Sequence, residues 1–212
     1  MRSILSIVAL SFLLALPVSG TAAEEVANGI FLVAREGMRD PNFKKSVVLV
    51  TKPKVGGPFG VIINRPLELR LSDVFLEFDS LKNRKDVLYF GGPVKPQGFV
   101  FLVRSVKRPP RGMWVLKDVY FTGDTELIEG LLHRPDPTKG LRIFVGYSGW
   151  GPGQLQREIS RGDWLIVPAT AETVFDDDPE KIWPKLIKYA GAKKTGSHAS
   201  HSYVEATSVN GE

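Results

Sequence analysis

The chain has 212 residues, a formal net charge of +5 and no cysteine. Without cysteine it can form no disulfide, thiol nucleophile or cysteine–metal site, which excludes several classes of enzyme and of small disulfide-stabilised domain. Its basic residues are spread along the chain and interleaved with acids, whereas a nucleic-acid-binding protein typically presents a denser basic face.

The first residues predict an export leader. A short basic start, Met1-Arg2, precedes a mainly apolar run at 4–18, and small residues at 21–23 precede the acidic pair Glu24-Glu25. This order is typical of a secretory signal peptide cleaved after Ala23, so residues 1–23 are predicted as the leader and the mature protein as periplasmic or secreted. An uncleaved anchor or a mis-assigned start is the alternative. No stretch of the mature chain is long and apolar enough to predict a transmembrane span.

Residues 24–191 have the length of one domain. Short β-branched and aromatic runs predict strands at 30–34, 46–51, 59–63, 87–90, 99–103, 113–115, 119–121, 141–145 and 164–167. The first three are almost continuously apolar, which indicates strands covered on both faces. Helices are predicted at 71–78 with Ser72 as N-cap, from Thr125 to before Pro135, at 152–161, and at 179–191 with a kink at Pro184. Strands in runs with interspersed helices favour an α+β fold, and the polar residues 192–212 are predicted to be a mobile tail.

The strongest candidate for a site is the segment GYSGWGPGQL at 146–155, between a predicted strand and a predicted helix. Its glycines allow a tight turn and close backbone approach, and Tyr147 and Trp150 are large amphipathic side chains. Free backbone N–H groups at the start of the helix could hold an anion or a carboxylate. The alternative is that the glycines, Gly151 among them, only keep the turn rigid and let Trp150 pack.

Catalytic motifs are incomplete. Gly146-Tyr-Ser148 begins like a nucleophile elbow, but Trp150 stands where that motif needs glycine, and a base would have to come from His133, His198 or His201. The glycines match neither a dinucleotide-binding nor a Walker pattern. We therefore predict no catalytic residue, no cofactor and no metal site, with a hydrolase using Ser148 as the alternative.

A second motif lies near the start of the domain. In Asp40-Pro41-Asn42-Phe43, followed by Ser46, Asp and Asn side chains can hold a turn by bonding to their own backbone, and Pro41 fixes one φ angle. A structural turn is the favoured interpretation.

Four ordered motifs resemble the AlgH/YqgE family of bacterial proteins: MRDPNFKKSVV at 38–48, GVIINRP at 60–66, GGPV at 91–94 and GYSGWGPGQL at 146–155. The resemblance runs from about Gly29 to Gly191. It implies one compact α+β domain with a bifurcated, coiled mixed β-sheet and several helices, and no established enzyme activity. Some members are named transcriptional regulators, but this sequence has no helix-turn-helix pattern. Members are typically cytoplasmic, so the leader and the tail after Gly191 are departures.

The function predicted from these observations is a non-catalytic binding or regulatory protein whose partner is an unknown protein or small ligand, with nucleic acid disfavoured. Its site residues are expected to converge on one concavity and are Asp40, Asn64, Gly92, Tyr147, Ser148, Trp150, Gly151 and Gln154. The alternatives are the Ser148 hydrolase and a transcriptional regulator.

Overall fold

The computed structural model describes residues 29–53 and 56–206, and the predicted leader lies outside them. The strands are β1 Ile30–Ala34, β2 Val47–Thr51, β3 Phe59–Ile62, β4 Pro66–Arg70, β5 Val87–Phe90, β6 Val94–Arg104, β7 Met113–Leu116, β8 Val119–Thr122, β9 Leu141–Gly149 and β10 Trp164–Pro168. The helices are α1 Leu71–Val74, the 3₁₀ turn η1 Asp79–Leu81, α2 Thr125–Leu132, α3 Gln154–Arg161, α4 Ala171–Val174 and α5 Pro179–Ala206. The predicted α+β class is confirmed.

The strands form one mixed, branched sheet in the order β10-β1-β2-β3-β9-β6-β8-β7, with β5 paired to β9 and β4 to β5. Neighbours in the main path are antiparallel, whereas β5 and β9 are parallel. The branch lies at β9, where β6 occupies one edge. On the other edge, Phe144 and Val145 pair with β5, while Ser148 and Gly149 pair with β3. We call this division of one edge between two strands the fork.

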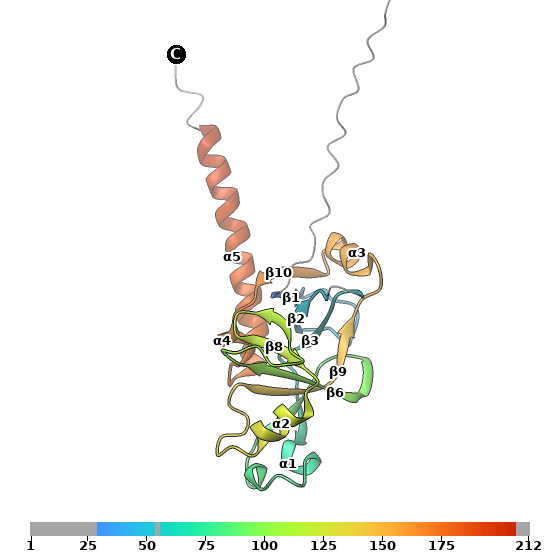
Figure 1. Ribbon diagram of the computed structural model, residues 1–212. Coiled ribbons are helices and arrows are strands. Elements are labelled where there is room, and N and C mark those ends of the chain that lie inside the picture. Colours follow the sequence, from blue (N-terminus) through green and yellow to red (C-terminus); the bar gives the residue numbers. More distant parts are fainter. Residues whose placement is uncertain (1–28, 54–55, 207–212) are drawn as a thin grey trace, which may run out of the picture.

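Both faces of the first three strands are buried, as their apolar sequences predict. Alternate residues such as Phe31 and Leu49 pack with Ile182 and Leu186 of α5, and the intervening residues, such as Leu32, pack with residues of the α3 side. A third cluster joins α1 and α2 to the far part of the sheet. Figure 1 shows α5 beside β10 and β1, α3 at the opposite side, and α1 and α2 at the other end of the molecule.

The prediction of a helix at 71–78 is wrong in its length. The helix ends at Val74, and Ser72 lies inside it, because Arg70 is the N-cap residue and makes no side-chain cap. Phe78 and Leu81 instead turn into the cluster with α2, so burial of these side chains outweighs continuation of the local helix. Strand β4 and helix α4 were not predicted.

The final helix α5 continues through Pro184 and past the predicted end at Gly191 to Ala206. No proline follows Pro184 in this stretch, so every later residue can donate its backbone N–H to the helix. Residues 192–206 of the predicted tail are therefore helical, and 207–212 lie outside the described residues. Among the described helices, none is long and apolar enough to cross a membrane.

Candidate functional site

The segment predicted as one turn is divided between a strand and a helix start. Residues 146–149 belong to β9, which is longer than predicted because Tyr147 pairs with Val94 of β6 and Ser148 with Gly60 of β3. Gly146 has a φ of 67°, and a Cβ there would lie 2.4 Å from the Gly92 carbonyl oxygen. Only glycine fits this close approach without strain, so Gly146 lets β9 pass Gly92.

Ser148 is fully buried at the fork. Its exposed fraction is 0%, and its hydroxyl donates a hydrogen bond of 3.1 Å to the carbonyl oxygen of Gly91. The same oxygen accepts the N–H of Ile62 at 3.0 Å. Gly92 lies against this pair, because a Cβ on it would be 2.4 Å from Ser148 Oγ. Ser148 and Gly92 thus hold the branches of the sheet together.

Trp150 lies in the core on the α3 side. It is 6% exposed, its ring packs edge-on at 6.5 Å from that of Trp164, and its Nε1 donates to Glu158 Oε2 at 2.9 Å. The Trp164 indole donates to the same oxygen at 3.0 Å, and Gln154 Nε2 donates to Oε1 at 2.9 Å. Glu158 therefore joins two buried indoles to α3.

Gly151 and Gln154 close the turn between β9 and α3. Gln154 Oε1 accepts the Gly151 N–H at 3.1 Å, and Gly153 is the left-handed residue that begins the helix, with a φ of 68°. A Cβ on Gly151 would meet nothing nearer than 3.8 Å. The prediction that Gly151 itself is conformationally constrained is therefore wrong, since Gly146 and Gly153 carry the left-handed conformations.

Asp40 and Asn64 hold a separate turn. Asp40 accepts the N–H of Asn42 at 2.9 Å. Asn64 accepts the N–H of Val47 at 2.7 Å and donates to the carbonyl of Lys45 at 2.9 Å, a residue with φ 55°. Arg65 adds hydrogen bonds to two carbonyls of the same loop, and burial lowers its pKa. The hydrogen bonds of Asp40 and Asn64 all go to backbone groups of this loop, which agrees with the structural turn favoured from the sequence.

An apolar recess of about 640 Å³ opens between the ends of β3, β6 and β9. We call it the β3–β9 recess; its lining residues are Gly57, Pro58, Phe59, Val94, Val100, Tyr147, Gly149 and Trp150. Phe59 and Tyr147 meet edge-on there, with ring centroids 6.1 Å apart. Of the predicted site residues, the structure brings Tyr147 and Trp150 to this recess, while Asp40, Asn64, Gly92, Ser148, Gly151 and Gln154 do not line it.

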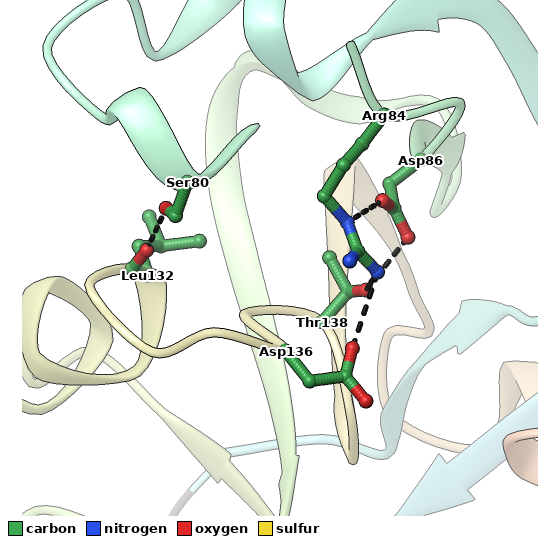
Figure 2. A network of polar contacts seen from close by, with 6 residues as sticks. All are labelled: Ser80, Arg84, Asp86, Leu132, Asp136 and Thr138. Carbon is green, nitrogen blue, oxygen red and sulfur yellow. Dashed lines mark hydrogen bonds and ion pairs between the residues drawn. The ribbon is translucent and has the colours of Figure 1, made fainter. Parts of the chain in front are cut away.

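A second cavity, of about 1090 Å³, was not predicted. It lies between β5, the start of β9 and the segment before α5, and we call it the β5–β9 cavity. A polar network forms one wall (Figure 2): Arg84 donates to Asp86 at 2.6 Å and to Asp136 at 3.1 Å, and Thr138 donates to Asp86 at 2.6 Å. Beside it Ser80 donates to the Leu132 carbonyl.

Two groups in this network have shifted pKa values. Burial by itself raises the pKa of Asp86, but hydrogen bonds from Arg84 and Thr138 and the charge of Arg84 together outweigh it, so the pKa is lowered. The hydrogen bond to Asp86 raises the pKa of Arg84. Both groups are therefore held in their charged forms. The sequence contains one indication of this cavity, because Arg142 is a charged residue inside the apolar run 141–145.

Comparison with known proteins gives a consistent match over the domain. A family model described as AlgH-like matches residues 31–195. A UPF0301 protein of Myxococcus xanthus is 37% identical over 164 residues, covering 76% of this chain and 88% of the relative. Another from Chlamydia felis is 32% identical over 165 residues, covering 78% and 87%.

Two solved structures are similar. A crystal structure of a Corynebacterium diphtheriae protein superposes with a TM-score of 0.64 at 26% identity, covering 78% of this chain and 87% of that chain. The solution structure of the AlgH protein from Pseudomonas aeruginosa gives 0.60 at 29% identity, covering 77% and 86%. The similarity in structure covers about the same share of the chain as the similarity in sequence.

Proposed function

Because this chain belongs to the AlgH-like family, a family of uncharacterised function, we propose from its own geometry that it is a non-catalytic binding protein. The β3–β9 recess takes an apolar group of a small ligand. The observation that carries the proposal is that this concavity is apolar and that residues of the motifs at 91–94 and 146–155 help to line it. Apart from the Tyr147 phenol, its described lining contains no side chain that could act as an acid or a base.

The recess has the composition of a small-molecule site. Such sites are mostly apolar and aromatic, with a few polar groups that fix orientation. Here Phe59, Val94 and Val100 supply partly buried apolar surface. The Tyr147 hydroxyl has no hydrogen-bond partner among the described residues, so it is free to donate to or accept from a ligand.

The position of Ser148 favours binding over hydrolysis. A nucleophilic serine needs access to substrate and a base within hydrogen-bond reach, whereas the Ser148 hydroxyl is buried and donates to a backbone carbonyl. His133 packs on Phe78 near the end of α2, and Phe78 belongs to the cluster around α1 and α2. His133 is therefore not a hydrogen-bond partner of Ser148. The transcriptional-regulator alternative would require contact with DNA, and nothing in the charge pattern favours it.

The test uses neutral aromatic and aliphatic fragments added to isotope-labelled protein. Amide signals of Phe59, Val100 and Gly149 should shift saturably, and Val94→Arg, which places a charge in the recess, should abolish the shifts. Val106→Arg is the matched control, because Val106 is 90% exposed and lies outside the recess. Absence of saturable shifts in the wild type, or their persistence in Val94→Arg, would refute the proposal.

We also propose that the protein acts after export. This proposal rests on residues 1–23, which have the pattern of a secretory leader. Cell fractionation should find it in the periplasm or medium with an N-terminus at or near Glu24. A cytosolic protein that retains Met1 would support the cytoplasmic alternative that the family suggests.

A further inference from the structure

The β5–β9 cavity contains a buried arginine for which the described residues supply no counter-ion. Arg142 is 8% exposed and lines the cavity. Its Nη1 donates to the hydroxyl of Tyr89 and its Nη2 to the carbonyl of Asp176, while its buried Nε has no acceptor. No carboxylate of the described residues forms an ion pair with it, although a buried charge is costly unless it is paired.

The charged residues that line the cavity leave it a small positive excess. Of the acids in its wall, Asp86 and Asp136 are paired with Arg84, and the basic Arg104 is paired with Glu172 outside the wall. Because Asp86 and Asp136 share the single charge of Arg84, the lining keeps a small positive excess, with Lys85, Lys139 and Arg142 unpaired among the described residues. The excess positive charge favours a negatively charged occupant.

Tyr89 adds a directed donor. Its hydroxyl oxygen accepts from Arg142, and the guanidinium lies over the tyrosine ring at 4.6 Å from the centroid. Because the oxygen already accepts a charged donor, the phenolic proton is available to a second acceptor. Tyr89 also lines the cavity, so its O–H and the arginine form one recognition unit.

We propose that the β5–β9 cavity binds a small organic anion, with its carboxylate or phosphate held by Arg142 and Tyr89 and attracted by Lys85 and Lys139. A planar guanidinium matches both kinds of anionic group. The cavity volume of about 1090 Å³ exceeds that of an inorganic ion, and Leu71 and Phe175 provide apolar wall for the rest of the molecule. This site is separate from the β3–β9 recess and does not depend on the function proposed there.

The experiment measures the thermal midpoint with matched pairs of charged and neutral compounds at constant ionic strength. Glycerol 3-phosphate is compared with glycerol, and succinate with 1,4-butanediol. A ligand that binds only the folded state raises the midpoint with its concentration. We expect one or both anions, and neither neutral compound, to stabilise the wild type. The effective pair distinguishes phosphate from carboxylate.

Three variants locate the effect. Arg142→Met should weaken anion binding at least about tenfold, as loss of a buried charged partner does. Lys85→Gln with Lys139→Gln should weaken it about three- to tenfold through loss of two exposed charges. Lys117→Gln is the control, an exposed lysine outside the cavity, and should leave binding unchanged.

A purely structural role for Arg142 gives a different pattern. Arg142→Met would then lower the midpoint but leave the concentration dependence on anion as in the wild type, which would overturn the proposal. So would a wild type that no anion stabilises. If Arg142→Met does not fold, Tyr89→Phe together with the lysine variants decides the matter, and unchanged anion affinity in both would refute the site.

Discussion

Replacing Trp150 with alanine should destabilise the protein by about 3–5 kcal/mol, the cost of truncating a large aromatic side chain in a core. The indole is 6% exposed and packs on Trp164. About 1.5–3 kcal/mol of the loss is assigned to the hydrogen bond from Nε1 to the Glu158 carboxylate. A typical domain has only about 5–15 kcal/mol of stability, so the variant should unfold at much lower denaturant.

Urea unfolding followed by far-ultraviolet circular dichroism measures the effect without relying on tryptophan fluorescence. Trp150→Phe keeps an aromatic ring but removes the N–H, and should cost less than the alanine variant. Trp114→Ala is the matched control, since Trp114 is 47% exposed, and it should cost clearly less stability than Trp150→Ala. If Trp150→Ala and Trp114→Ala lose the same stability, the buried role assigned to Trp150 is wrong.

Three further predictions concern the fork and the polar network. Ser148→Ala should fold and lose about 1 kcal/mol by urea unfolding, because the Gly91 carbonyl keeps its bond from Ile62; covalent labelling of wild-type Ser148 by a serine-hydrolase probe would contradict the non-catalytic assignment. Gly92→Ala should cost about 2 kcal/mol or more, since its Cβ would lie 2.4 Å from Ser148 Oγ, and an unchanged urea midpoint would contradict the close approach. The lowered pKa of Asp86 stabilises the fold above the unfolded pKa of about 3.9, and this contribution disappears as pH falls through the folded pKa. The thermal midpoint of the wild type should therefore exceed that of Asp86→Asn near neutral pH and converge with it in acid, and a gap that is independent of pH would refute this.

The fold could be predicted from the sequence wherever local pattern and tertiary contacts agree. The apolar run at 30–34 forms β1 with the predicted bounds, and Asp124 caps α2 by accepting the N–H of Leu127. The sequence could not predict β4, because Pro66 and polar residues obscure a strand that exists through pairing with β5. Strand β6 likewise begins at Val94, before Pro96 and Gly98, because it pairs with the distant Tyr147.

The candidate site was predictable in part for the same reason. The segment at 146–155 indicated an aromatic turn, and Tyr147 and Trp150 do line one recess. The sequence could not show that Asp40 and Asn64 hold a separate turn. Their role depends on which backbone groups the fold brings next to them, such as the Val47 N–H and the Lys45 carbonyl beside Asn64. Arg142 is different, because the sequence alone shows a charged residue inside an apolar run that is typical of a buried strand.

The fork has a consequence for the order in which the sheet can be completed. Strands β3 and β5 both complete their pairing on β9, which begins only at Leu141. Until that strand is synthesised, both earlier strands present unpaired N–H and carbonyl groups, the kind of edge that recruits other chains. The two strands therefore stay open to association with other chains until residues up to Gly149 are available, and β1 stays so until β10, Trp164–Pro168, pairs with its free edge.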